Sequence, residues 1–292
     1  MTADVHLLAD ETNTSVAAVC RAFDIPRSTV YARRKRTTSK RTKANAVLDV
    51  EVKAIHAESE RNYGSPRVYR ELRRRGQKVS RKRVARRMQA LGLQARRPKR
   101  FVRTTEADPS KAPAPNLLNR RFDGWRPDQA WVADITYIWT LLGWVYLAIV
   151  VDLGTRAIIG WAVSKHCDTA LALRGLNAAV ARRKPPSGTL HHTDRGATYT
   201  ADDYQARLRQ LGMQVSMSRK GNCWDNAVAE STIGTIKAEL LGEIVPDDIH
   251  QVQRMLFPYI EGFYNRKRLH SSLGYMTPAE VELMATDRKI VA

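Results

Sequence analysis

The sequence predicts an α/β protein in which all-helical units precede a mixed β-sheet core. Three observations support this prediction. Helical spacing with capping residues dominates the first 97 residues, strand-like runs begin near residue 128, and almost all of the excess positive charge lies before residue 122. A hydrophobic content of 43% in 292 residues is enough for two or three domains with a sizeable buried core.

The positive charge is concentrated in the N-terminal part of the chain. Residues 1–121 contain 30 Lys and Arg against 11 Asp and Glu, whereas residues 122–292 contain 19 against 18. The net charge of +20 therefore arises before the sheet core and favours a polyanionic partner, most simply nucleic acid. A ribosomal or membrane-surface protein would also be basic, but neither class explains the nearly neutral C-terminal half.

The three cysteines, Cys20, Cys167 and Cys223, are scattered. They predict neither a disulfide framework nor a zinc knuckle, and they suggest a reducing cytosol. Residues 1–11 lack the basic start and apolar stretch of a signal peptide. The longest apolar run, 141–151, is too short to cross a bilayer and is typical of a buried strand. We expect a cytoplasmic protein with no zinc and no membrane partner.

The first segment, residues 1–45, is expected to be helical. Ser15 can cap one helix, and a turn through residues 24–26 leads to a second helix from about Arg27. This pattern fits either a helix-turn-helix or a plain helical hairpin, and the sequence does not favour one over the other.

Residues 46–97 predict a basic trihelical domain. Apolar residues at helical spacing mark a first helix over 48–55, Ser65 is the expected N-cap of a second, and Ser80 caps a third. A basic last helix fits a DNA-binding module whose last helix enters a groove, although a solvated basic face on an ordinary helical domain is the alternative. The predicted DNA contacts are Arg81, Lys82, Arg83, Arg86 and Arg87.

A proline-containing basic linker is expected over residues 98–127. Such a segment could lie along the DNA backbone.

From about residue 128 the pattern changes to strands and then to alternating strands and helices. The predicted strands cover 131–140, 143–152, 156–163, 188–193 and 213–217, the first three as an antiparallel meander. Helices are expected at about 168–183 and 201–211, followed by the helix that carries Glu230. Residues 128–245 are therefore compatible with a ribonuclease-H-like core, and residues 246–292 form a helical extension with a capping box at Thr277 and Glu280.

Three carboxylates stand out within this core. Asp134 lies in a half-buried strand, Asp194 lies where a strand runs into a Gly turn, and Glu230 lies in the opening turns of a helix, with 35 residues between Asp194 and Glu230. Acidic side chains from separate elements can converge on two divalent metals, the arrangement used for phosphodiester cleavage and joining. Each residue alone has a structural alternative, namely a strand Asp, a turn Asp or a solvated helical Glu. The joint pattern predicts a catalytic, metal-binding set.

The expected metal is Mg²⁺, with Mn²⁺ as a substitute, because hard cations prefer carboxylate oxygens. Without metal, repulsion between the three carboxylates should raise their pKa values. Lys237, seven residues beyond Glu230, lies on the same helical face and could hold DNA backbone or be an ordinary surface lysine. His191 and His192 point to opposite faces of a strand, so we expect packing or substrate positioning rather than joint metal binding.

At these residues the chain resembles the transposases of the insertion-sequence three family, in the DDE superfamily with retroviral integrases. The matching stretches are WVADITYI around Asp134, HTDRGATY around Asp194, SMSRKGNCWDNAVAES up to Glu230, YNRKRLHSSLGYMTPAE over 264–280, and the N-terminal YGSPRVYRELRR. The resemblance implies a ribonuclease-H-like core, Mg²⁺ dependence, and cleavage and joining at terminal inverted repeats.

The resemblance also implies roles for single residues and for partners. It makes Asp134, Asp194 and Glu230 the catalytic triad and Lys237 a DNA contact. Within the matching motifs, further DNA contacts are expected at Arg195, Asn265, Arg268 and His270. The expected partners are double-stranded DNA of element ends and target, further copies of the chain on that DNA, and an upstream-frame protein or fusion. The expected location is the bacterial nucleoid.

The sequence departs from the family pattern at Ser231-Thr232-Ile233, where members often have Ser-Phe-Phe; this should alter packing rather than chemistry. It lacks the His/Cys zinc module of retroviral integrases and shows no heptad run. Two alternatives stay open: a catalytically silent DNA-binding regulator of transposition, and a nuclease acting on RNA–DNA hybrids.

Overall fold

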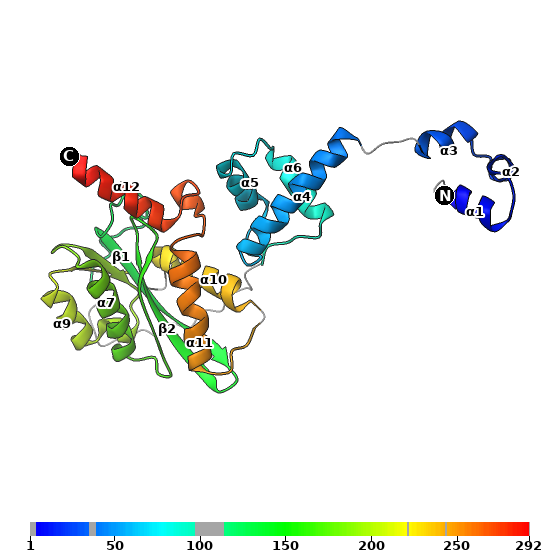
Figure 1. Cartoon of the computed structure of the whole chain (residues 1–292). Helices are drawn as coiled ribbons and strands as arrows, with labels where there is room; N and C mark the ends of the chain where they lie inside the picture. The colour runs from blue at the N-terminus through cyan, green and yellow to red at the C-terminus, as the bar shows by residue number, and fades with distance from the viewer. Residues whose placement is uncertain (1–3, 35–38, 97–113, 221, 243, 292) are drawn as a thin grey trace.

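The computed structural model describes residues 4–34, 39–96, 114–220, 222–242 and 244–291 (Figure 1). A five-stranded mixed sheet in the order β3-β2-β1-β4-β5 forms the centre. Its strands are β1 (Ala130–Thr140), β2 (Gly143–Asp152), β3 (Ile158–Ser164), β4 (Leu190–Thr193) and β5 (Gln214–Met217). The first three strands pair antiparallel, and β4 and β5 add in parallel beside β1. The predicted mixed sheet and meander are confirmed.

Helices cover both faces of the sheet (Figure 1). On one face, α7 (Thr169–Arg183) and α9 (Asp202–Gln210) pack against Trp131 and Ala133. On the other face, α10 (Ala227–Ile236) and α11 (Ile249–Phe257) pack against Val132 and Ile138. Alternate residues of β1 therefore enter opposite cores, as the period of a strand requires. Asp134 shares the parity of Val132 and lies on the α10 side.

Two predicted strands begin two residues later than expected, and a short helix within the core was not predicted. The strand predicted from 156 begins at Ile158, because Arg156 has φ +61° and donates its N–H to the Asp152 carbonyl in the turn before the strand. The strand predicted from 188 begins at Leu190, because Gly188 has φ +89° and donates its N–H to the Gly212 carbonyl. The helix predicted over 201–211 is α9, and a short helix that was not predicted, α8 (Ala197–Thr200), precedes it with Ala201 extended between the two.

The N-terminal segment contains three helices: α1 (Asp4–Glu11), α2 (Val16–Ala22) and α3 (Arg27–Arg34). The predicted cap is confirmed, since Ser15 Oγ accepts the Ala18 N–H at 3.2 Å. The two predicted helices share a small core with α1, which the sequence analysis missed; its buried members include Val5, Ala9, Val19 and Val30.

The predicted trihelical domain is α4 (Lys40–Glu58), α5 (Ser65–Arg74) and α6 (Arg81–Ala90). Ser80 Oγ accepts the Arg83 N–H, so the cap of α6 is confirmed. The prediction for Ser65 was wrong by one residue: Gly64 is the extended N-cap and Ser65 begins the helix. Proline at the second helical position is tolerated because the N–H it lacks would have no helical acceptor.

The trihelical domain packs on the C-terminal part of the chain. The Tyr63 hydroxyl donates to the Lys267 carbonyl at 3.0 Å and accepts the Leu269 N–H at 2.8 Å. Arg67 Nε donates to the Leu269 carbonyl at 2.9 Å. Val68 and Leu72 of α5 belong to the same buried cluster as α10 and α11. The trihelical domain and the sheet are thus joined by a continuous core.

Part of the predicted linker, residues 98–113, lies outside the described residues. Its remainder follows the sheet: the Leu117 and Leu118 N–H groups donate to Ser216 Oγ on β5, and Leu118 is fully buried. Leu117 and Leu118 therefore pack against the sheet and do not form an extended linker.

The C-terminal part continues from α11 through a π-helical turn, η3 (Pro258–Tyr264), and a short 3₁₀ turn, η4 (Ser271–Leu273), to α12 (Pro278–Val291). The capping box that begins α12 is confirmed: the Thr277 N–H donates to Glu280 and the Glu280 N–H donates to Thr277. Among the helices of the described ranges, none combines the length and apolar character that a membrane span needs.

The close contact of β3 with α7 yields a stability prediction. A methyl group at Gly160 would lie 2.6 Å from the backbone nitrogen of Ala179 and would also clash with the Gly175 carbonyl. We expect Gly160→Ala to lower the free energy of unfolding by about 2 kcal/mol or more in urea titrations. Gly175→Ala is the control: its methyl would reach Ala148 at an ordinary 3.4 Å. Equal stability of the two variants would contradict this packing.

Candidate active site

Asp134 lies in the middle of β1 and is half-buried. Its Oδ1 accepts the Ile135 N–H at 2.9 Å. Burial, followed by the charges of Asp194 and Glu230, raises the pKa of Asp134 well above its ordinary value. The Lys237 ammonium and the Ile135 N–H act in the opposite direction. The other two predicted carboxylates and the predicted lysine therefore all lie close enough to Asp134 to affect its charge.

Each of the other two carboxylates comes from its own element. Asp194 directly follows β4, which pairs in parallel with β1, and its Oδ1 accepts the Gly196 N–H at 2.9 Å. Glu230 is exposed in the first turn of α10. Neighbouring parallel strands carry Asp134 and Asp194 at one side of the sheet, and α10 brings Glu230 to that side.

The donor set can be tested against the expected cation. Within the described ranges, no three His, Cys, Asp or Glu side chains stand as a formed metal site. The chemistry nevertheless fits a hard divalent cation, because all three groups are carboxylates and their mutual repulsion contributes to the raised pKa of Asp134. A cation beside Asp134 would offset the cost of holding that charge in a half-buried strand.

Lys237 lies beside Asp134 at the start of a π-helical turn, η2 (Lys237–Leu241). Its Nζ is 4.5 Å from the ring centroid of Tyr137, three residues beyond Asp134 on β1. Burial lowers the pKa of Lys237 to about 8, although the Asp134 charge raises it. A π turn is uncommon in helices and frequent at functional sites. It begins here at the residue predicted to contact DNA.

A buried polar loop that the sequence analysis did not single out leads into α10. Asp225 is fully buried and accepts hydrogen bonds from the Arg219 backbone, the Arg219 guanidinium and the Arg120 guanidinium. The Arg219 hydrogen bonds, followed by those of Arg120, hold the pKa of Asp225 well below its usual range. Asn226 Nδ2 donates to the Ala133 carbonyl at 3.1 Å. The sequence feature that could have indicated this loop is the Asp225-Asn226 pair immediately before the helix.

Both histidines are buried and bonded within the core. His191 Nε2 lies 2.8 Å from the Tyr204 hydroxyl, and His192 Nδ1 lies 2.8 Å from Ser216 Oγ. Burial lowers the pKa of His191 to about 3 and that of His192 to about 4. Their opposite orientations and internal partners fit packing.

The predicted contacts on α6 divide into two groups. Arg81, Lys82 and Arg86 are exposed. Arg83 instead donates to Asn45 on α4 at 2.9 Å, and Arg87 makes a two-point ion pair with Asp49 on α4 at 2.6 and 2.7 Å. In the core, Arg195 Nε donates to the Ser218 carbonyl.

The three predicted contacts of the 264–280 motif have internal partners. The Asn265 side-chain amide accepts a hydrogen bond from the Ile158 N–H and donates one to the Ile158 carbonyl, both at 2.9 Å. Arg268 is buried in a two-point pair with Glu239 at 2.7 and 2.8 Å. His270 is buried with its ring edge against Tyr264. Arg268 and His270 are thus held by partners within the protein, and their contacts with DNA stay predictions.

Comparisons with known proteins agree with this arrangement. Two family models described as "Integrase core domain" match residues 125–223 and 211–278, and one described as "HTH-like domain" matches residues 43–101. The chain is 38% identical over 272 residues to "Transposase InsF for insertion sequence IS3A" of Escherichia coli (strain K12), covering 92% of this chain and 94% of that relative. The chain belongs to the insertion-sequence three family of transposases.

Two further similarities concern a relative and a solved structure. The "Insertion element IS600 uncharacterized 31 kDa protein" of Shigella sonnei is 39% identical over 261 residues, covering 89% of this chain and 96% of the relative. The catalytic core domain of HTLV-2 integrase, solved in complex with magnesium, matches with 18% identity and a TM-score of 0.43 over 55% of this chain and 99% of that one. In this transposase, the integrase core is the five-stranded sheet with its helices, and the helix-turn-helix-like domain is α4–α6.

The buried histidine of the 264–280 motif predicts acid sensitivity. Burial, followed by the Arg268 charge, lowers the pKa of His270 from 6.5 to about 3. Between these pH values only the unfolded chain takes up the proton, so the contribution of His270 is present above pH 6.5 and is lost as pH falls. The free energy of unfolding should fall by up to about 1.4 kcal/mol per pH unit from this residue alone.

The measurement is chemical denaturation at a series of pH values for wild type and His270→Phe. Below pH 6.5 the free energy of unfolding of His270→Phe should depend less steeply on pH than that of wild type. His166→Asn, which changes an exposed histidine, is the control and should keep the wild-type slope. Parallel slopes for wild type and His270→Phe would contradict this account.

Proposed function

We propose that this transposase cleaves and joins DNA strands at the terminal inverted repeats of its element, by phosphoryl transfer at a divalent-metal site held by Asp134, Asp194 and Glu230. The observation that carries the proposal is the placement of these carboxylates: Asp134 lies on β1, Asp194 directly follows the parallel neighbour β4, and Glu230 lies in the first turn of α10, which packs on the same face of β1. Alternative structural roles explain each residue singly, but they do not explain why three like charges gather at one side of the sheet.

The residues have separate tasks. Mg²⁺, or Mn²⁺ in its place, would supply charge stabilisation for an in-line displacement at phosphorus. Asp134 is held by β1 and by the Ile135 N–H, Asp194 by its turn, and Glu230 by the first turn of α10. These supports orient the carboxylate oxygens before substrate binds. Lys237, with a pKa of about 8, is mostly protonated at neutral pH and would hold a substrate phosphate beside them.

The proposed partners follow from this activity. They are duplex DNA of the element ends and the target, further copies of this chain that pair two ends, and an upstream-frame protein or fusion. We also propose a location with the nucleoid. Two activities compete with the proposal: catalytically silent regulation, which would leave binding without products, and cleavage of RNA–DNA hybrids, which a hybrid substrate would reveal.

The catalytic assignment is tested with Glu230→Gln. This change keeps the size of the side chain and removes its charge, so we expect strand cleavage and joining to fall to background. The measurement uses DNA carrying the element's own ends, with Mg²⁺, Mn²⁺ or chelator. Glu230 is exposed, so duplex binding should persist. Asp203→Asn, exposed on α9, serves as the control. Cleavage retained by Glu230→Gln would overturn the assignment.

The two groups of basic residues on α6 predict different phenotypes. Replacing exposed Arg81, Lys82 and Arg86 by Gln should reduce the slope of log affinity against log salt by about 0.9 for each phosphate that the helix no longer neutralises. Replacing Arg83 and Arg87, which bond α4, should chiefly reduce stability. Duplex binding across a salt series, with thermal melts of both variants, checks this division. An unchanged salt slope in the first variant would argue against α6 as the DNA-contacting helix.

A further inference from the structure

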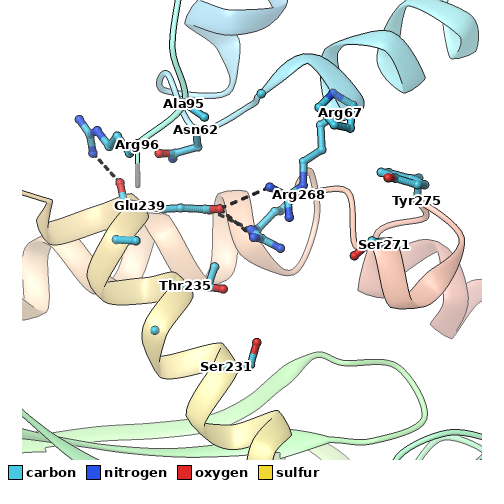
Figure 2. A pocket seen from close by; sticks show the side chains of 14 residues that line it. Asn62, Arg67, Ala95, Arg96, Ser231, Thr235, Glu239, Arg268, Ser271 and Tyr275 are labelled. Carbon is cyan, nitrogen blue, oxygen red and sulfur yellow. Dashed lines mark hydrogen bonds and ion pairs between the residues drawn. The ribbon is translucent and has the colours of Figure 1, made fainter. Parts of the chain in front are cut away.

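A pocket of about 600 Å³ lies where the helix-turn-helix-like domain meets the integrase core (Figure 2). One wall is the start of α5, at Gly64 and Pro66. The opposite wall is α10, at Ser231, Gly234 and Thr235, directly beyond Glu230. The candidate catalytic helix and the DNA-binding domain therefore border one space, which we call the interdomain pocket.

The lining of the interdomain pocket has an excess of positive charge. It contains three guanidinium groups, from Arg67, Arg96 and Arg268, and one carboxylate, from Glu239. That carboxylate is used by Arg268 through two hydrogen bonds and by the Tyr259 hydroxyl at 2.9 Å.

The other two arginines are less well compensated. The Arg67 guanidinium is 3.8 Å from Glu239, and Arg96 donates to the backbone carbonyl of Glu239 rather than to its carboxylate. Burial and the neighbouring Arg268 charge lower the pKa of the Arg67 guanidinium. Arg268 is buried, Arg67 is partly buried and Arg96 is exposed, so three cations face one anion and the pocket is suited to an anionic ligand.

A second, independent observation comes from Asn62. Its side chain lines the pocket, and the residue is only 2% exposed (Figure 2). Within the described part of the protein, neither its Oδ1 nor its Nδ2 has a hydrogen-bond partner. Buried amides are almost always satisfied, so an unsatisfied one at a pocket wall indicates a missing ligand. The α5 N-terminus beside it has neither a side-chain cap nor an acidic residue in its first turn, which leaves it available to an anion.

Gly234 shows that the space is kept open from the α10 side. A Cβ built at this helical position meets no atom within 4 Å. Glycine weakens a helix interior relative to larger residues, so its presence here needs a reason other than helix stability. The lack of a side chain leaves room for a phosphate together with its adjoining sugars.

We propose that the interdomain pocket binds a backbone phosphate of the DNA on which the transposase acts. This inference rests on the proposed function, because it takes element-end DNA as the substrate. The position of the pocket favours DNA over a small free anion, since it opens between a DNA-binding domain and the helix that carries Glu230. A phosphate held there would fix the position of the DNA relative to the candidate active site.

The test compares two substitutions of equal size at Gly234. Gly234→Glu and Gly234→Gln both add a side chain where a Cβ meets no atom within 4 Å, but only Glu places a negative charge in the pocket. We expect Gly234→Glu to weaken binding of a duplex carrying the element's own terminal repeat by about tenfold or more. Its salt slope should fall by about 0.9, and Gly234→Gln should lose clearly less affinity.

A variant on the opposite wall provides an independent check. Asn62→Leu removes the unsatisfied amide at similar volume, so it should leave the melting temperature unchanged or higher and still weaken duplex binding. The assays use the full chain, with thermal melts alongside and Asp203→Asn as the reference for wild-type behaviour.

The outcomes are distinguishable. Wild-type affinity and salt slope in both Gly234→Glu and Asn62→Leu, while wild type binds the duplex, would overturn the pocket assignment alone. Inorganic phosphate that stabilises wild type but not Gly234→Glu, with duplex binding equal in both, would assign the pocket to a small anion and overturn the DNA assignment. Failure of wild type to bind the duplex at all would overturn both the pocket assignment and the proposed function.

Discussion

The architecture depends on the central strand β1, which pairs antiparallel with β2 and in parallel with β4 while burying both of its faces. These pairings leave β1 almost no freedom to shift, because a slip of one residue would exchange the side chains of its two cores. Asp134 is therefore held where a carboxylate is costly. The raised pKa of Asp134 reflects that cost, because burial and the neighbouring carboxylates both disfavour its charged form. The strand pairings prevent β1 from shifting, so Asp134 cannot move to a more exposed position where its charge would cost less.

A second constraint is the buried pair of Glu239 and Arg268. Glu239 lies in the π turn that begins at Lys237, and Arg268 lies in the 264–280 motif. A buried ion pair contributes little net stability, but removing one partner is strongly unfavourable. It therefore specifies how the C-terminal segment docks against the end of the candidate catalytic helix. The bonds of Asn265 to Ile158 do the same at the start of β3.

The sequence predicted the parts of the fold that depend on local periodicity. The β1–β2 hairpin, the helix caps at Ser15 and Ser80 and the capping box at Thr277 were found from spacing and residue type alone. The observed strand boundaries differ from the predicted ones where contacts distant in sequence determine them. Gly188, for example, donates a hydrogen bond to Gly212, which is 24 residues further along the chain. The internal partners of Arg268 and His270 could not be predicted for a related reason: a basic motif looks the same in sequence whether its charges contact DNA or a buried carboxylate. The partner, Glu239, is 29 residues from Arg268 and carries no local sign of the pairing.

Helix α10 connects the sheet, the candidate active site and the interdomain pocket, because different faces of the helix contact each of them. Ile233 and Ile236 pack into the core, Glu230 is exposed in the first turn, and Gly234 borders the interdomain pocket. At 1.5 Å rise per residue, the last two positions are separated by only about one helical turn. A small shift of the helix-turn-helix-like domain against α10 would therefore change both the pocket and the position of Glu230. The shared core of α5 and α10 resists that shift, so the packing of the protein itself would position any DNA bound by the helix-turn-helix-like domain relative to the candidate active site.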